Sequence, residues 1–276
     1  MAAPPAPLII FTCTWYPSTE DLRFLQCVET LEAAREHSCP AIVVVDGSPS
    51  KRVHEALRST GTIVHKQTFS GGKGAALREA AGIAADHAGA SADTLLCWQE
   101  PEKTDMIRLW AKVHSALKPT DDVVVPRRTQ QSFQSSYPIE QFYSESYGNL
   151  YLDAVMKNAI QGSGDAASAI VMPRADTDTP RGTSILDWHF GPFAFRAKHV
   201  DLWTKYTGSS YDAQIVPYVH GIRKGLSVCG VDVDFVLDEK MRQQEEGNAE
   251  FIEKRLNQLN ELDPKVKAAW TDDLYC

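Results

Sequence analysis

The sequence predicts an α/β protein with a mostly parallel sheet, helices on both faces and a mixed C-terminal half. Up to residue 126, continuous apolar runs of strand length alternate with segments of helical period, beginning with Leu8–Thr14. Such runs are typical of parallel strands that are buried on both faces. After Pro126 the alternation gives way to aromatic, turn-rich sequence. A chain of 276 residues can bury one large core, so we expect a single domain over 1–276, with halves at 7–126 and 127–276.

The elements of the first half follow one another as strand and helix. Strands are expected where apolar residues run without interruption, at Leu8–Thr14, Ala41–Val45, Thr62–Lys66, Thr94–Cys97 and Asp122–Pro126. Helices are expected where apolar residues recur every three or four positions, at Asp21–His37, Lys51–Ser59, the alanine-rich stretch from Gly74 to Gly89, and Asp105–Leu117. This order predicts crossover connections between parallel strands.

The second half has fewer regular signals. Helices are expected at Tyr143–Asn158, Tyr211–Lys224 and Asn248–Trp270, and strands within Ile185–Phe195 and Leu226–Val236. Residues 127–137 are polar and predict turns. The segment Gly162–Arg181 predicts a loop, which is either a lid over a ligand or a plain surface loop.

Composition limits the partners. The net charge is −8 and the pI is near 5.5, so nucleic acid or an anionic membrane surface is not expected as the main partner. No apolar stretch reaches the length of a membrane span, and the N-terminal MAAPPAP lacks the pattern of a secretory signal. The six cysteines form no CxxC pair, which favours reduced thiols and a cytoplasmic location. The sequence leaves open whether the protein is a monomer or a homodimer.

Polar turns follow three of the predicted strands. Asp46-Gly47-Ser48 ends the second strand, and its carboxylate can accept hydrogen bonds from a base N–H or a ribose hydroxyl, although Asp-Gly turns are common everywhere. Gly71-Gly72-Lys73-Gly74 opens a helix, where free N–H groups and a cation suit a phosphate. It is not a Walker loop, because Ala75 stands where Ser or Thr must be. A plain strand-to-helix corner is the alternative. The third turn, Gln99–Glu102, follows the fourth strand.

The order VVVDGS, SGGKGAALREA and an acidic turn after the fourth strand resembles family 2 glycosyltransferases of the GT-A fold, of the dolichol-phosphate mannose synthase or mannosylglycerate synthase type. The resemblance covers roughly residues 7–110. It implies a GT-A-like, Rossmann-like fold and a nucleotide-diphosphate sugar, a UDP- or GDP-sugar, as donor. It also implies donor contacts from both strand ends and turns: Thr12, Thr14 and Asp46 for base and ribose, and Gly72, Lys73, Gln99 and Glu100 nearby.

One departure from this family affects the metal. Where the family has D-x-D, this chain has Cys97-Trp98-Gln99, and the segment Phe235–Met241 lacks the histidine that some relatives use. Glu100 and Glu102 could take over as ligands of Mg²⁺ or Mn²⁺ if the turn is reshaped.

Cations can replace that metal. A unit charge pair at ~4 Å contributes about 4 kcal/mol at an effective dielectric constant of ~20. Lys73, Lys103, Arg127 and Arg128 follow strand ends and can stabilise a diphosphate leaving group, although a surface salt bridge is an equal alternative for the two arginines. We therefore expect no metal ligands and no tightly bound cofactor.

The acceptor side is expected in the second half. Asp187-Trp188-His189-Phe190-Gly191 resembles the family's aromatic turn, with Trp188 and Phe190 stacking on a sugar and Asp187 and His189 contacting hydroxyls. An aromatic core cluster is the alternative. Asp212, at a helix start, matches the position of the acceptor-side carboxylate and can serve as a base, an acceptor anchor or a simple N-cap.

These expectations combine into a glycosyltransferase, specifically a hexosyltransferase, acting on a small soluble acceptor, with 7–126 as the nucleotide-binding half and 127–276 as the acceptor half. Two alternatives stay open. One is an inactive relative that kept the fold as a binding or scaffold protein. The other is the same fold adapted to different nucleotide chemistry, such as nucleotidyl transfer.

Overall fold

The computed structural model describes residues 7–36, 42–89, 91–162, 170–177 and 183–271. They form two compact units. Unit 1 comprises Met1–Ser115 and Pro192–Ala213, and unit 2 comprises Ala116–Gly191 and Gln214–Cys276. The single domain with halves at 7–126 and 127–276 stays a prediction.

The sheet of unit 1 contains the predicted parallel strands. They are β1 (Leu8–Thr14), β2 (Ile42–Asp46), β3 (Ile63–Lys66) and β4 (Leu95–Trp98), followed in the chain by β7 (Phe193–Arg196). The strand order is β3-β2-β1-β4-β7, with β7 antiparallel to β4 and the other pairs parallel. Four strand positions are confirmed to within a residue or two; β1, β2 and β4 are almost entirely buried, whereas β3 (IVHK) is partly exposed.

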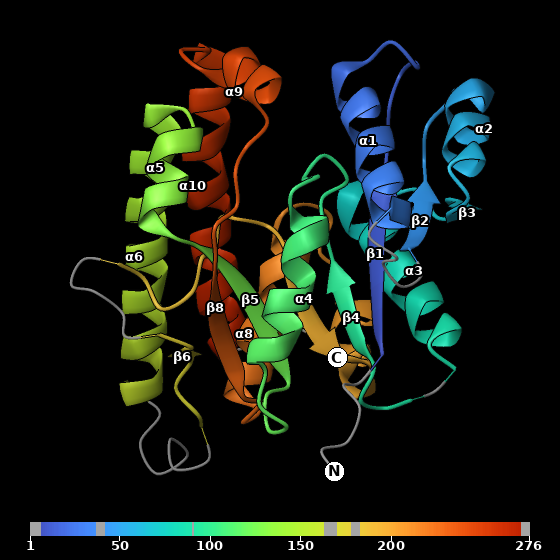
Figure 1. The fold of residues 1–276 in the computed structure, drawn as a ribbon. Helices are drawn as coiled ribbons and strands as arrows, with labels where there is room; N and C mark the ends of the chain where they lie inside the picture. The colour runs from blue at the N-terminus through green and yellow to red at the C-terminus, as the bar shows by residue number, and fades with distance from the viewer. Residues whose placement is uncertain (1–6, 37–41, 90, 163–169, 178–182, 272–276) are drawn as a thin grey trace. The chain divides into compact units, whose positions relative to one another are not determined.

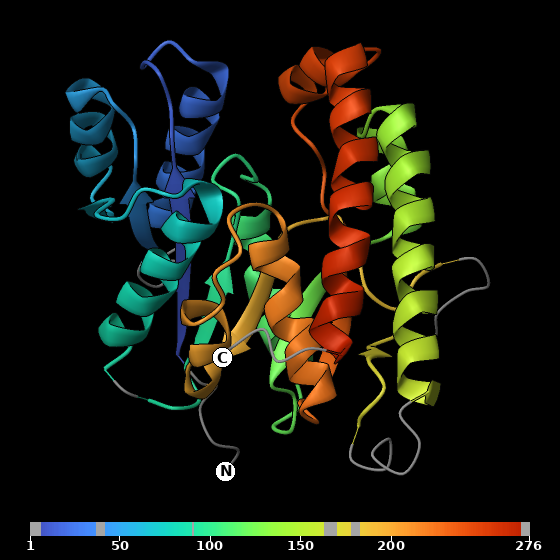
Figure 2. The ribbon, with the colours of Figure 1, turned by 180° about the vertical axis from the view of Figure 1, so that it is seen from behind.

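Helices connect these strands. They are α1 (Leu22–Glu36), α2 (Lys51–Ser59), α3 (Gly72–His87) and α4 (Met106–Ala116), with η2 (Ala197–His199) and α7 (Asp201–Thr204) after β7. Helix α3 packs on β1 and β2, on the face turned to the viewer in Figure 2. Its buried face is built from small residues such as Ala80 and Ala84, which let the helix lie close to the sheet.

Unit 2 has three parallel strands in the order β5-β8-β6: β5 (Val123–Arg128), β8 (Val228–Val233) and β6 (Arg174–Ala175). Its helices are α5 (Gln130–Ser136), α6 (Ile139–Gly162), α9 (Glu239–Glu245) and α10 (Ala249–Thr271), and α8 (Asp212–Arg223) leads into the unit. Helices α6 and α10 lie side by side (Figures 1 and 2), and Tyr151 donates a 2.8 Å hydrogen bond to Asp263 between them.

The prediction of turns over residues 127–137 is wrong, because α5 occupies most of that segment. The Thr129 side chain accepts a hydrogen bond from the Ser132 backbone N–H, so a local cap starts a helix whose composition is polar. Helix α6 is also longer than the predicted Tyr143–Asn158, and β8 is shorter than the predicted Leu226–Val236.

The predicted fold class is confirmed: the protein is α/β, with mostly parallel strands flanked by helices. Across the described residues, no helix combines the length and apolar character needed to cross a bilayer. Among the described residues, Cys13, Cys27, Cys97 and Cys229 are free thiols, while Cys39, Cys276 and most of the Gly162–Arg181 loop lie outside the described residues.

Candidate functional site

A cavity of about 720 Å³ lies in unit 1 where β1, β2, β3 and β4 end. We call it the strand-end cavity. It has the size of a site for a nucleotide-sized molecule. Its main lining residues come from the four strand ends, the glycine turn and the turn after β4: Cys13, Thr14, Trp15, Tyr16, Arg23, Gly47, Lys66, Gln67, Phe69, Gly71, Gly72, Lys73, Trp98, Glu100 and Glu102.

The glycine turn before α3 needs its glycines. Gly71 and Gly72 have φ values of 140° and 73°, which side-chain-bearing residues rarely adopt. A Cβ on Gly74 would lie 2.0 Å from the Gly208 carbonyl oxygen. The Gly74 N–H donates to the Ser209 carbonyl at 3.0 Å, so residues 208–209 press directly against the start of α3.

Two of the predicted cations contact the carboxylate of Glu100; Lys73 lines the cavity together with Glu100, and Lys103 is not among the lining residues. Lys73 Nζ lies 2.7 Å and Lys103 Nζ 3.3 Å from the two Glu100 carboxylate oxygens. Burial acts to raise the pKa of Glu100, but the two ammonium groups outweigh it and hold the pKa well below its usual range. Lys73 also lies over the ring of Trp98 at 5.9 Å and of Tyr211 at 5.8 Å. Together, Lys73, Lys103 and Glu100 carry two positive charges and one negative charge.

The residues after β4 do not fit a metal site. Glu100 is held by the two lysines. The second acidic residue, Glu102, pairs with Arg23 at 3.1 Å and accepts a hydrogen bond from the Tyr16 hydroxyl at 3.2 Å. The Gln99 amide is used within the fold, where its oxygen accepts from the Trp110 indole and its nitrogen donates to the Lys103 carbonyl. Within the part of the chain that the structure describes, no group of three or more His, Cys, Asp or Glu side chains could hold a metal ion.

Asp46 lies behind the cavity rather than on its surface. Its buried carboxylate accepts from the Thr14 hydroxyl and the Ser48 N–H, and pairs with His54 Nδ1, each at 3.0 Å. It fixes the corner at which Thr14 and Gly47 line the cavity. Thr12 is buried and is not among the lining residues. A direct contact of Asp46 or Thr12 with a base or ribose stays a prediction.

The sequence interpretation missed two aromatic side chains. Trp15 and Phe69 line the strand-end cavity and are 65% and 66% exposed, although residues of this size are usually buried. Both residues stand in polar loops, and a large aromatic residue in such a loop was the sequence signal that could have indicated them. Arg23 and Lys66 add two further cations to the lining.

Asp212 stabilises the segment that backs the glycine turn. Its carboxylate accepts from the Tyr206 hydroxyl at 2.7 Å and from both the N–H and the hydroxyl of Ser210 at 3.2 Å. Arg78 of α3 donates to the carbonyl groups of Tyr206 and Gly208. Asp212 is buried, and these contacts fit a positioning role for its carboxylate.

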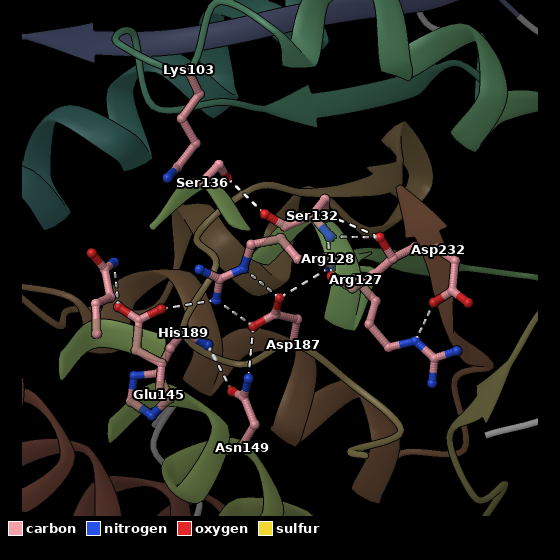
Figure 3. A network of polar contacts seen from close by, with 12 residues as sticks. Lys103, Arg127, Arg128, Ser132, Ser136, Glu145, Asn149, Asp187, His189 and Asp232 are labelled. Carbon is pink, nitrogen blue, oxygen red and sulfur yellow. Dashed lines mark hydrogen bonds and ion pairs between the residues drawn. The ribbon is translucent and has the colours of Figure 1, made fainter. Parts of the chain in front are cut away.

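In unit 2, Arg128 and Asp187 form the centre of a buried network (Figure 3). Asp187 accepts from Arg128 Nε at 2.7 Å and Nη2 at 2.8 Å, and from Asn149 at 2.7 Å. Arg128 Nη2 also reaches Glu145 at 2.8 Å. Burial would lower the pKa of Arg128 and raise that of Asp187, but their mutual attraction reverses both shifts. Both groups are therefore charged.

Arg127 has its own partners in unit 2. Its guanidinium lies 2.5 Å from Asp232 and donates to the Ser184 carbonyl at 2.9 Å and the Thr177 hydroxyl at 3.0 Å. Both arginines of the predicted diphosphate set are thus paired with carboxylates of unit 2.

The aromatic turn 187–191 packs as a core cluster. Trp188 and Phe190 are each 1% exposed and contact Tyr218 and Phe235, with ring centroids 5.5 Å and 5.0 Å apart. His189 lies against Gly148 of α6, where a Cβ would be 2.6 Å from Nε2, and burial lowers its pKa. Gly191 has φ 102° and ends the turn. These positions match the core alternative, and stacking of Trp188 or Phe190 on a sugar stays a prediction.

Comparison with known proteins shows the fold. No family model matches the chain, and no curated protein matches its sequence. Similar solved structures include glucosyl-3-phosphoglycerate synthase from Mycobacterium tuberculosis with Mn²⁺, UDP and glucosyl-3-phosphoglycerate, at a TM-score of 0.58 and 10% identity over 97% of this chain and 82% of that one. The same enzyme with Mn²⁺, UDP-glucose and phosphoglyceric acid has a TM-score of 0.58 at 9% identity, with the same coverage. The chain therefore has the GT-A fold of these glycosyltransferases.

Proposed function

We propose that the protein is a glycosyltransferase that takes its sugar from a nucleotide-diphosphate donor and passes it to a small acceptor. The observation that carries this proposal is the strand-end cavity, which combines exposed aromatic rings, a glycine turn at a helix start and an excess of cations. The similar solved structures support it, because they are complexes with UDP and with UDP-glucose.

Each part of the cavity suits one part of such a donor. Trp15 and Phe69 offer faces on which a base can stack. Thr14 and Gly47, fixed by Asp46, offer polar contacts for ribose. The diphosphate would be bound by backbone N–H groups at the N-terminus of α3 and by Lys73.

Negative charge builds on the leaving nucleoside diphosphate as the bond to the sugar breaks. Lys73 and Lys103 lie side by side on Glu100 and can stabilise that charge. Each cation at ~4 Å contributes about 4 kcal/mol at an effective dielectric constant of ~20. Because Glu100 and Glu102 are engaged by cations, the proposed donor site works without a metal ion. Arg127 and Arg128 are not part of it, since carboxylates of unit 2 hold them.

We assign Asp212 a positioning role in this reaction. Its carboxylate holds residues 206–210 against the glycine turn, so its loss would disturb the place where the diphosphate binds. The acceptor's proton is not assigned to it. The cytoplasmic location and the oligomeric state stay predictions from the sequence.

The test is donor binding and turnover with UDP- and GDP-sugars, in Mn²⁺ or in EDTA. We expect a nucleotide-induced thermal shift and a turnover that both survive EDTA. Lys73→Ala should weaken UDP binding at least tenfold, since a charged hydrogen bond contributes about 1.5–3 kcal/mol. Lys112→Ala, which removes an exposed lysine of α4 outside the cavity, should leave it unchanged. Turnover lost in EDTA would show that the turn after β4 does bind metal.

The alternative with a specific observation behind it is an inactive relative of the fold. The absent D-x-D pair and the carboxylate held by two lysines fit a site that has lost its metal and its reaction. In that case UDP-sugars would give neither turnover nor a thermal shift, and Lys73→Ala would change nothing measurable beyond stability.

A further inference from the structure

A second cavity, of about 290 Å³, lies wholly within unit 2. We call it the unit 2 cavity. The ends of β5 and β8 supply Arg127, Arg128 and Asp232, and helix α6 and the segment before Trp188 supply Asn149 and Asp187. Its volume is at the lower limit for small-molecule sites, so a ligand must be small, about the size of one sugar ring.

Charge decides what kind of ligand it takes. Each of the two arginines in the lining already has its own carboxylate: Arg127 pairs with Asp232 and Arg128 with Asp187. The lining is therefore neutral in sum. An anion would therefore find no unbalanced positive charge in the lining, and separating the buried Asp187 from Arg128 to provide one costs about 3–5 kcal/mol. A cation would meet the same obstacle from the guanidinium groups. A neutral ligand meets neither obstacle.

The remaining polar groups specify hydroxyls. The Ser146 hydroxyl and the Gln130 amide both line the cavity, and each can donate and accept hydrogen bonds. The bonds of Arg128 to Asp187 and Glu145 use Nε and Nη2, which leaves Nη1 as a donor. Phe133 and Phe142 supply an apolar wall. Donors, acceptors and ring faces together match the C–H face and hydroxyl edge of a sugar or cyclic polyol.

We infer that the unit 2 cavity binds a small neutral polyhydroxylated molecule, of monosaccharide size. That this molecule is the acceptor of the reaction rests on the proposed transferase function. That the cavity binds it does not depend on that function. A neutral ligand would distinguish this chain from the similar solved structures, which are complexes with phosphoglyceric acid, an anion.

The experiment measures binding to the full chain by calorimetry, in the absence of donor. The probes are D-glucose and myo-inositol as neutral polyols, and D-glycerate and 3-phosphoglycerate as anions. We expect at least one neutral polyol to bind more tightly than either anion. Ser146→Leu, which fills the cavity from α6, should weaken that binding at least tenfold. Ser144→Leu, two residues away on the same helix and outside the lining, is the matched control and should bind as the wild type does.

Gln130→Ala gives a second, milder variant in case Ser146→Leu fails to fold, and it should weaken binding several-fold. The inference is overturned if no neutral polyol binds, if an anion binds more tightly than every polyol, or if the Ser146 and Gln130 variants bind as well as the wild type. UDP binding, measured on the same samples, separates the two proposals. Polyol binding without UDP binding would end the transferase proposal and leave the unit 2 cavity as inferred.

Discussion

Asp187→Asn is expected to destabilise the protein strongly, because it removes the charge opposite a buried guanidinium. Asp187 Oδ2 accepts from the Arg128 backbone N–H at 3.1 Å and Nε at 2.7 Å, and Oδ1 accepts from Arg128 Nη2 and Asn149 Nδ2. The asparagine amide nitrogen can accept none of these. Whichever way it turns, two donors of the present network face an N–H group.

The size of the effect follows from the burial of the pair. The Arg128 and Asp187 side chains are 1% and 3% exposed, so water cannot replace the lost bonds. Removing one partner of such a pair costs about 3–5 kcal/mol of the free energy of unfolding. Glu145 stays bound to Arg128, which places the expectation in the lower part of that range.

The assay is urea-induced unfolding at pH 7, with the free energy obtained by linear extrapolation. Asp201→Asn is the control, because its ion pair with Lys205 is exposed on both sides and should contribute under about 0.5 kcal/mol. The double variant Arg128→Met/Asp187→Leu should be more stable than Asp187→Asn, since no buried charge is left unpaired. A loss below about 1 kcal/mol for Asp187→Asn, equal to that of the control, would refute this account of the network.

Two further predictions concern stability. Gly74→Ala should cost about 1–3 kcal/mol, because its Cβ would lie 2.0 Å from a backbone oxygen, whereas Gly82→Ala in the same helix, with its nearest atom at 3.9 Å, should gain about 0.5–1 kcal/mol; equal effects in thermal unfolding would contradict this. Burial raises the pKa of Asp153 to about 6, so the folded state holds that proton more tightly than the unfolded chain, and the resulting stability is lost as the pH rises from about 4 through 6. The unfolding free energy of the wild type minus that of Asp153→Asn should fall over this window, and a flat difference would show that the pKa is not raised.

Strands β1, β2 and β4 of unit 1 were predictable because burial on both faces leaves a nearly continuous apolar run, as at Leu8–Thr14. Helix α5 was not, because its residues are polar and its start depends on one hydrogen bond to the Thr129 side chain. Local composition cannot report such a cap. Helix α6 extends beyond both ends of the predicted Tyr143–Asn158, and the helical spacing of Ile139 and Phe142 in its first turn was not used in the prediction.

The candidate site was predicted by residue type more fully than by arrangement. Lys73, Glu100 and Lys103 were each expected near a donor, but the contact between Lys73 and Glu100 joins positions 27 residues apart and exists only in the folded chain. Arg128 was expected to meet a phosphate, yet its partners come from Glu145 and Asp187, which lie 17 and 59 residues further along. A sequence shows which side chains carry charge, whereas pairing decides which charges remain available.

That pairing separates the two cavities chemically. At the strand-end cavity, Lys73 and Lys103 share the carboxylate of Glu100; Lys73 lines the cavity, and Lys103 is not among its lining residues. A diphosphate that binds Lys73 would leave Glu100 paired, because Lys103 can stay with that carboxylate. In the unit 2 cavity, each arginine has a carboxylate of its own, and Arg128 holds two. An anion in that cavity would find no arginine without a carboxylate partner, and its negative charge would repel the buried carboxylates. This difference in pairing is why we propose an anionic ligand for the strand-end cavity and a neutral one for the unit 2 cavity, in spite of its two guanidinium groups.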